Sequence, residues 1–419
     1  MKDYRMSIQH APKDTSFDVA DILVSRTDRR GVIASINSSF EHVSGYAWPK
    51  LQGAPHKILR HEDMPKGVFY LFWEMLQKNR AVGAYVKNRR KDGSHYWVFA
   101  CAAPIQGGYL SVRIKPTAEG IEMAQKLYGQ LLDLEAELSP SESAEKLVEL
   151  LHEAGFRDYG AFMSERISVE TRARNAEIGR KPHDMSRLIR KLADQWGEID
   201  RLCKAISANH QSMRHTPINL GVQASKLQSQ GVALGGIARN FSALAEKIKE
   251  MMSAFQKSSL SVEDAIAETR FLTCQSRLMQ EVVAIFDEET TTYEGISWDV
   301  EVDLLNSKSN ADFERAVQGL SEVRSSVQRF MKVSDSIAFL LSGLSVSSVM
   351  CDIEGAYMSP EAKARVTGTS AELENFRSDT QHHLAELKEV LSASVDLVNE
   401  AQRLFSSNRH QNAERMIAS

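Results

Sequence analysis

A heptad repeat of apolar residues in the second half of the chain restricts the folds that are open to it. The repeat steps by three and four residues along Leu234, Ile237, Phe241, Leu244, Ile248, Met251 and Phe255, which is the spacing of a coiled-coil seam. Comparable stripes run from Leu188 to Ile206, from Phe313 to Phe330 and from Leu384 to Val398. Such stripes usually form the core of a helical bundle and carry no chemistry. From Thr117 onward the sequence therefore predicts an all-α region of coiled-coil helices and helical hairpins.

The first 116 residues have a different pattern, with short alternating or β-branched runs separated by turn residues. These runs are Ile22–Val24, Val32–Ile36, Tyr85–Val86, Tyr96–Ala102 and Tyr109–Ile114. We expect Asp92-Gly93 to form a tight two-residue hairpin turn, because both residue types tolerate positive φ angles. The pattern predicts a five-stranded antiparallel sheet with helices, so the whole chain is expected to be of the α+β class.

The breaks in these patterns predict the domain limits. We expect an N-terminal tail at 1–18, an α+β domain at 19–116, a helical connector at 117–183, a helical hairpin at 184–292 and a C-terminal helical bundle at 293–419. The hairpin should turn near Lys226 to Gly231, where a glycine can adopt positive φ. The alternative turn is His215-Thr216-Pro217, since proline removes a helical hydrogen-bond donor.

Composition excludes several classes of protein. A net charge of −4 gives no basis for nucleic-acid binding, which requires a concentrated basic face. The cysteines Cys101, Cys203, Cys274 and Cys351 have no metal-ligand spacing, which favours reduced thiols in a cytoplasmic protein without a metal site. The N-terminus lacks the apolar core of a signal peptide. The most apolar run, residues 336–350, is too short and too rich in serine to predict a membrane span.

Three stretches of the α+β domain carry a family resemblance: "INSSFEHVSGY" at 36–46, "LQGAPHKILRHEDMPKGVF" at 51–69 and "VKNRRKDGSHYWV" at 86–98. Together they resemble the PAS domain of the aerotaxis receptor family, whose members are flavin-binding redox sensors. The resemblance implies FAD as the cofactor and a cofactor-binding set of Asn37, Arg60, His61, Asp63, Trp73 and Asn88. An isoalloxazine ring needs aromatic walls and a few hydrogen-bond partners. Trp73 can supply the wall, and Arg60, His61 and Asn88 can supply donors, while Arg60 can also pair with Asp63.

Other interpretations of this region stay open at this point. Arg89, Arg90 and Lys91 can hold a pyrophosphate, but a solvated charge run at a hairpin end is the simpler interpretation. Cys101 lies on an expected strand and not in the helical cysteine motif of light-sensing flavin domains, which argues against adduct photochemistry. A haem-binding PAS domain is a further alternative.

A second resemblance lies in the helical half. The stretch "INLGVQASKLQSQGVALGGIARNFSALA", residues 218–245, resembles the hairpin tip of the methyl-accepting chemoreceptor signalling domain. The resemblance implies a chemotaxis kinase or coupling protein as partner. The family's glutamates are replaced here by Gln223, Ser229 and Asn240, and its Arg-Gly-Phe reads Val232-Ala233-Leu234. These departures place that partner in doubt and leave another signalling protein as the alternative.

The two resemblances together predict a redox- or oxygen-sensing signal transduction protein, in aerotaxis, chemotaxis or a related bacterial pathway. We expect a soluble relative of the receptor that forms a homodimer through its helical region, because exposed heptad seams are costly on a monomer. The competing interpretations are a flavin-free PAS scaffold and a small flavoenzyme. The absence of a GxGxxG fingerprint, a nucleophile elbow and kinase motifs argues that the protein is not an enzyme.

Overall fold

The computed structural model describes residues 17–181, 183–227 and 231–418. Its N-terminal part contains a five-stranded sheet in the order β2-β1-β5-β4-β3. The strands are β1 (Leu23–Asp28), β2 (Ile33–Ile36), β3 (Val82–Arg89), β4 (His95–Ile105) and β5 (Gly108–Ile114). Every neighbouring pair is antiparallel. The five-stranded antiparallel sheet expected from the sequence is therefore confirmed.

Four short helices connect β2 to β3 and pack on one side of the sheet: α1 (Ser38–Ser44), α2 (Trp48–Leu51), the 3-10 helix η1 (His56–Leu59) and α3 (Lys66–Gln77). Asn37 caps α1, because its side chain accepts a hydrogen bond from the Phe40 amide. Gly45 ends α1 in the left-handed conformation that glycine adopts most easily. This connection supplies one wall of the cavity described below.

The β3–β4 hairpin differs in detail from the expectation. The Arg90 amide donates to the Ser94 carbonyl at 2.8 Å, which leaves a loop of three residues, Lys91 to Gly93. Only Gly93 has a positive φ, of 87°, and the Asp92 carboxylate accepts from the Ser94 amide at 3.0 Å. The expected two-residue turn is therefore wrong; the chain uses the three-residue loop that places one glycine in the left-handed region.

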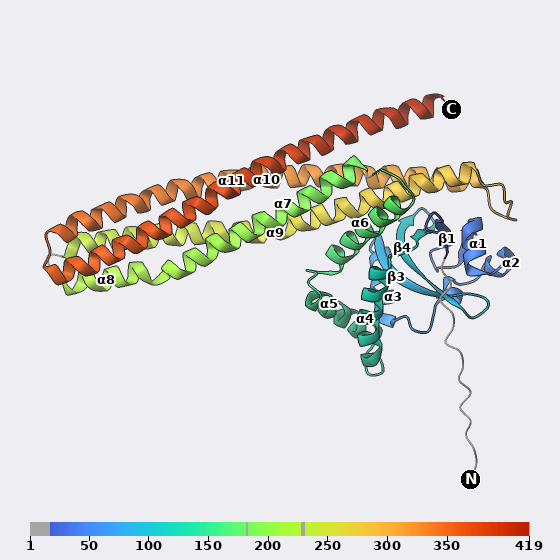
Figure 1. Ribbon diagram of the computed structural model, residues 1–419, viewed down its shortest axis with the longest axis horizontal. Helices are drawn as coiled ribbons and strands as arrows, with labels where there is room; N and C mark the ends of the chain where they lie inside the picture. The colour runs from blue at the N-terminus through green and yellow to red at the C-terminus, as the bar shows by residue number, and fades with distance from the viewer. Residues whose placement is uncertain (1–16, 182, 228–230, 419) are drawn as a thin grey trace, which may run out of the picture. The chain divides into compact units, whose positions relative to one another are not determined.

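Three helices follow β5: α4 (Ala118–Leu134), α5 (Pro140–Glu153) and α6 (Tyr159–Glu177) (Figure 1). Helices α4 and α6 cover the other side of the sheet, whereas α5 packs on α3, where the Gly67 amide donates to the Ser143 hydroxyl at 3.1 Å. Tyr128 of α4 donates to the Tyr85 carbonyl, and Tyr159 of α6 donates to the Gly83 carbonyl, each at 2.9 Å. Both tyrosines are buried, so α4 and α6 are fixed to strand β3.

The remaining helices are long: α7 (Asp184–Ser212), the 3-10 helix η2 (Met213–His215), α8 (Thr216–Lys226), α9 (Val232–Asp287), α10 (Trp298–Ala356) and α11 (Pro360–Ala418). The chain forms two compact units, one of Met1–Arg187 with Ala267–Val317 and one of Leu188–Ile266 with Gln318–Ser419. Helices α9 and α10 each contribute to both units. The domains expected from the sequence follow one another along the chain, whereas each of these two units combines segments from separate parts of the chain.

The second unit contains the expected helical hairpin. Trp196 of α7 donates to the Ser259 hydroxyl of α9 at 3.2 Å, and His210 lies 2.8 Å from the Ala245 carbonyl. These antiparallel pairs place the reversal after α8, and not at Pro217, which lies within the first turn of α8. Residues 228–230, which include the substituted Ser229, lie outside the described part of the chain.

Gly231 is required for a different reason from the one expected. Its φ is not among the positive values of the described glycines. A Cβ atom at Gly231 would instead overlap the backbone of Ala224, including its carbonyl oxygen. The glycine thus permits α8 and α9 to approach closely.

Most residues of the four heptad stripes are buried within the chain. Phe255 of α9 stacks on Phe330 of α10 with ring centroids 3.9 Å apart, and Trp196 of α7 lies 5.4 Å from the same ring. Leu387 and Leu391 of α11 are buried as well. These stripes form the core of one chain's own bundle, so they provide no argument for a dimer.

Candidate functional site

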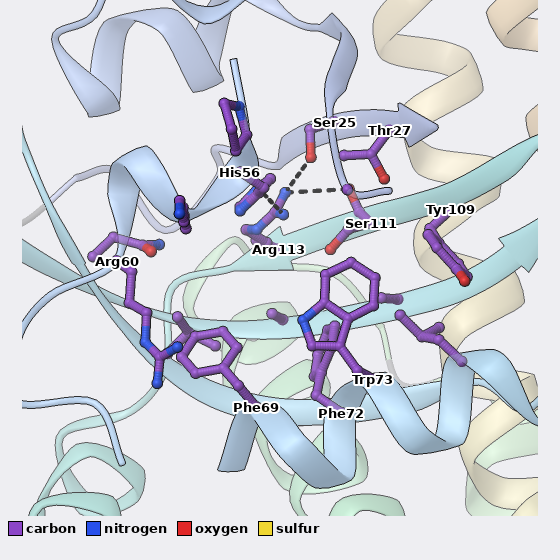
Figure 2. A pocket seen from close by; sticks show the side chains of 18 of the residues that line it. Ser25, Thr27, His56, Arg60, Phe69, Phe72, Trp73, Tyr109, Ser111 and Arg113 are labelled. Carbon is purple, nitrogen blue, oxygen red and sulfur yellow. Dashed lines mark hydrogen bonds between the residues drawn. The ribbon is translucent and has the colours of Figure 1, made fainter. Parts of the chain in front are cut away.

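A cavity of about 340 Å³ lies between the sheet and helix α3. Figure 2 shows the aromatic residues Phe69, Phe72 and Trp73 on one side of it and Arg113, His56 and Ser25 on the other. The volume falls within the range of sites that bind small organic ligands. The residues that line it are Ser25, Thr27, Arg30, Gly31, Pro55, His56, Lys57, Arg60, Phe69, Phe72, Trp73, Leu76, Val86, Asn88, Ala100, Ala102, Tyr109, Ser111 and Arg113.

The aromatic wall comes mainly from helix α3. Trp73 packs edge-to-face on Tyr109 of β5, with ring centroids 5.4 Å apart. Gly31, in the turn before β2, has a φ of 77°. A Cβ atom at this position would lie 2.9 Å from the Trp73 ring, so only glycine fits here. The Arg60 guanidinium lies 3.9 Å above the Phe69 ring. The wall is therefore held by contacts from the strands and the loop before α3.

The opposite wall contains a buried cation. Arg113 of β5 donates to the Ser25 hydroxyl at 3.0 Å, and its Nη2 lies 2.8 Å from His56 Nε2. Burial and the neighbouring Arg113 charge lower the pKa of His56 to about 3, so this imidazole is neutral and accepts from the guanidinium. Burial lowers the pKa of Arg113 to about 10, which still leaves it protonated at neutral pH. Within the described part of the chain no carboxylate pairs with Arg113.

Two further polar groups in the cavity have no hydrogen-bond partner among the described residues. They are the Asn88 amide nitrogen and the Ser111 hydroxyl, and both residues are buried. Buried polar groups without a partner are rare because each costs the free energy of its lost hydration. The described lining carries four Arg or Lys residues and no Asp or Glu. The cavity is therefore suited to a planar apolar ligand with hydrogen-bond acceptors and negative charge.

Comparisons with known proteins agree with this fold. A family model described as the PAS fold matches residues 33–111. The N-terminal domain is a PAS domain. It is related to the Escherichia coli aerotaxis receptor, with 44% identity over 114 residues that make up 26% of this chain and 22% of the receptor. The bacterioopsin transcriptional activator of Halobacterium salinarum is 27% identical over 108 residues, which cover 25% of this chain and 16% of that protein. The matched part is therefore about a fifth of each relative.

Solved structures with a similar PAS domain share little sequence with this one. The PAS domain of a Colwellia psychrerythraea protein is 20% identical and covers 22% of this chain and 85% of its own, with a TM-score of 0.22. The LOV domain of a blue-light activated histidine kinase from Erythrobacter litoralis EL346 is 17% identical and covers 22% of this chain and 90% of its own, with a TM-score of 0.20.

Three of the residues expected at the site line the PAS cavity: Arg60, Trp73 and Asn88. Trp73 is only half-buried because its ring borders the cavity. Arg60 donates to the Met64 and Pro65 carbonyls at 3.3 Å. The expected pairing of Arg60 with Asp63 is wrong, because these carbonyls and the Phe69 ring are its contacts in the structure.

The other three expected residues lie outside the lining. Asn37 accepts from the Val24 amide at 2.9 Å and donates to the Ile22 carbonyl at 2.8 Å, so its side chain is used to join β1 to α1. His61 is buried, accepts from the Asp63 amide and has a pKa lowered by burial and by Lys87. Asp63 pairs with Lys87 at 2.5 Å, and hydrogen bonding to that ammonium lowers its pKa. His61 and Asp63 shape the loop that leads into α3.

The cations expected near a pyrophosphate are also placed elsewhere. Arg89, Arg90 and Lys91 belong to the β3–β4 hairpin and do not line the cavity, whereas Arg30 and Lys57 do. Cys101 lies on β4, as expected, and the cavity is lined by its neighbours Ala100 and Ala102 instead. Since successive side chains of a strand point to opposite faces, Cys101 faces the covering helices.

Several lining residues were not singled out from the sequence, among them His56, Phe69, Phe72, Tyr109, Ser111 and Arg113. One signal was available in β5, whose sequence "GYLSVRI" places Tyr109, Ser111 and Arg113 at alternate positions. This alternation predicts a polar face on a buried strand. An arginine on such a face is a candidate for ligand binding.

Proposed function

We propose that the PAS cavity binds a flavin, FAD, and that the protein is a redox- or oxygen-sensing signal transduction protein. The observation that carries the proposal is the unneutralised Arg113 beside two unpaired polar groups in an aromatic-walled cavity. Its context is a PAS domain 44% identical to that of the aerotaxis receptor. Aerotaxis is movement guided by oxygen, and we extend this type of signal from the receptor to the present chain.

The lining residues have complementary roles in this proposal. Phe69, Phe72 and Trp73 enclose a planar ring, and Arg113, Ser111 and Asn88 hydrogen-bond to acceptor atoms at its edge. Arg30 and Lys57, both exposed, are suited to the phosphates. A bound flavin supplies reversible electron transfer, and the hydrogen bonds around the ring tune its potential.

The contacts of strand β3 support a route for the signal. Asn88 lines the cavity, while Tyr85 of the same strand donates to Glu170 of α6 at 2.5 Å. Two redox states signal only if the protein contacts differ between them. We infer that altered hydrogen bonding at Asn88 and Arg113 changes the packing of β3 on α6. The PAS domain and the receptor relationship support signalling, not enzymatic turnover.

The helical hairpin is the proposed output. Its tip, at the junction of α8 and α9, is where a chemotaxis kinase, a coupling protein or another signalling protein would bind. Gln223 and Asn240 replace charged residues of the chemoreceptor pattern, so we favour a partner that recognises a less acidic surface. Pulldown with the full chain, comparing wild type with Gln223→Glu/Asn240→Glu, tests whether these positions select the partner.

The experiment that tests the flavin proposal is the absorption spectrum of purified protein. We expect a yellow protein that releases FAD on denaturation. Ser111→Ala should leave stability unchanged or slightly increased, because the Ser111 hydroxyl has no partner among the described residues, and should weaken FAD binding about 3- to 10-fold through one lost hydrogen bond. Ser35→Ala, a buried serine on β2 away from the lining, is the matched control.

Different results would reject the proposal. Colourless protein that takes up no added FAD would leave a PAS scaffold, and a sharp Soret band would indicate haem. Equal FAD affinity of the Ser111→Ala and wild-type proteins would place the ligand elsewhere than against β5.

A further inference from the structure

Helix α10 and the turn residue that follows it, Tyr357, carry an exposed apolar stripe in the second unit. Its members are far more exposed than the bundle core: Phe339 78%, Val346 60%, Val349 55%, Met350 47%, Ile353 54% and Tyr357 84%. The spacing of Phe339, Val346, Met350, Ile353 and Tyr357 is that of a heptad seam. Residues 336–351 contain no charged side chain. We call these six residues the α10 stripe.

The opposite face of α10 is already packed within the chain. Leu341, Leu344 and Cys351 are buried, and the Ser348 and Ser370 hydroxyls lie 2.8 Å apart between α10 and α11. Asn240 of α9 lies 3.5 Å from the Ser347 hydroxyl. Helix α10 therefore has two apolar faces at this level, and the bundle of one chain covers only one of them.

We propose that the α10 stripe binds the same stripe of a second copy of this chain, with the two helices antiparallel and the two-fold axis near Ser348. This register places Phe339 of one copy opposite Tyr357 of the other, and Val346 opposite Met350. Ile353 then meets the small residues Ser342 and Gly343, which leave space for a branched side chain.

The exposed area is sufficient for a stable dimer. A fully exposed aromatic side chain offers about 150–250 Å², so the six side chains at these exposures offer on the order of 700 Å² from each copy. The pair would bury roughly 1,400 Å², within the size of a specific protein interface. Monomeric proteins rarely leave a contiguous apolar patch of this size in water.

A lipid bilayer is the other environment that would cover an apolar helix face. Helix α10 contains an 18-residue window of mean hydropathy 1.7, long and apolar enough to cross a membrane. Its neighbours at this level carry charges, however: Arg239 on α9, and Lys363, Arg365 and Arg377 on α11. Moving the bundle into hydrocarbon would bury those charges at high cost. The stripe therefore fits a second protein surface better than a membrane.

The test uses the full chain and two matched variants. Val349 and Val300 are both valines of α10, with exposures of 55% and 52%, and only Val349 belongs to the stripe. We expect wild type and Val300→Glu to be dimers by sedimentation equilibrium. Val349→Glu should weaken the dimer at least tenfold, because two carboxylates would meet close to the axis. Circular dichroism of all three proteins checks that each is folded.

Crosslinking tests the direction of the helices. The four native cysteines are buried, so Phe339→Cys/Tyr357→Cys protein should form disulfide-linked dimers on oxidation, while Phe339→Cys alone should not. Efficient crosslinking of Phe339→Cys alone would overturn the antiparallel register. A monomeric wild type, an unaffected Val349→Glu dimer, or flotation of a monomer with phospholipid vesicles that Val349→Glu abolishes would overturn the dimer. None of these results depends on the flavin.

Discussion

Replacement of Glu170 tests the junction between the PAS sheet and helix α6. The Glu170 carboxylate is buried and accepts from the Tyr85 hydroxyl at 2.5 Å and from the Thr117 amide at 2.6 Å. Arg166, also buried, lies 3.4 Å from it and donates to the Tyr85 hydroxyl at 2.9 Å. Burial acts to lower the pKa of Arg166, but Tyr85 and Glu170 more than offset this and raise it. Burial and the Glu170 charge raise the pKa of Tyr85.

Glu170→Ala removes the negative charge; Arg166 keeps its hydrogen bond to Tyr85, but the remaining carboxylate described near it is the exposed Glu119, at 3.8 Å. It also leaves the Tyr85 hydroxyl and the Thr117 amide without their acceptor. Removing one partner of a buried ion pair costs about 3–5 kcal/mol. We expect a loss of that size in the free energy of unfolding, measured by urea denaturation with circular dichroism and tryptophan fluorescence.

Two further variants separate the ion pair from general damage to α6. Glu165→Ala changes an exposed glutamate of the same helix and should alter stability by no more than about 0.5 kcal/mol. Arg166→Leu/Glu170→Leu removes both charges and should cost less than Glu170→Ala alone, since no buried charge is left unpaired. If Glu170→Ala cost no more than Glu165→Ala, the buried network would contribute nothing and the reasoning would be wrong.

Three other predictions concern the cavity and its loop. Trp73→Ala should lower FAD occupancy, measured by absorbance, at a stability cost below about 3 kcal/mol, because the ring already borders a cavity; full occupancy would contradict its role as a wall. Gly31→Ala should cost at least about 1–2 kcal/mol, since its φ is 77° and Trp73 blocks a Cβ; an unchanged urea midpoint would argue against this contact. Hydrogen bonding to Lys87 lowers the pKa of Asp63 in the folded protein. This pair therefore stabilises the fold at pH values above the unfolded pKa of about 3.9. The stabilisation is lost as the pH falls through the lower pKa of the folded state. Lys87→Met should therefore be less stable than wild type at pH 7, and the difference should shrink as the pH falls below the unfolded pKa of Asp63; a constant difference would refute the pairing.

The class of each half was predictable because the two apolar periods differ. A period of two appears in β5, and a period near 3.5 appears in α9. Each period belongs to one type of element. The turn after α8 was predictable because the stripes on α7 and α9 lie at similar distances from it. The reason for Gly231 was not, since its contact with Ala224 depends on how closely the two helices approach.

The site was predictable where a local motif carries it. The "RHEDMPK" stretch and the helix after it predict the neighbourhood of Arg60 and Trp73. This motif does not predict the contact between Arg113 and His56. The two residues are 57 positions apart in the sequence and meet only in the folded domain. A motif also does not distinguish residues that contact a ligand from residues that hold a loop in place. Asn37, for example, was expected at the cofactor, but its side chain caps helix α1.

The position of β3 explains why the cavity and the covering helices can be coupled. This strand is at the edge of the sheet and has β4 as its one neighbouring strand. Its outer carbonyl groups, at Gly83, Tyr85 and Lys87, instead accept hydrogen bonds from Tyr159, Tyr128 and the His61 amide. Val86 and Asn88 line the cavity, and Tyr85 contacts α6 from the opposite face. In the signalling route proposed above, a shift of β3 that gives Asn88 a partner would also move Tyr85, which donates to Glu170 at 2.5 Å. Only strand β3 lies between the cavity and helix α6 at this point, so the proposed signal needs no longer route through the protein.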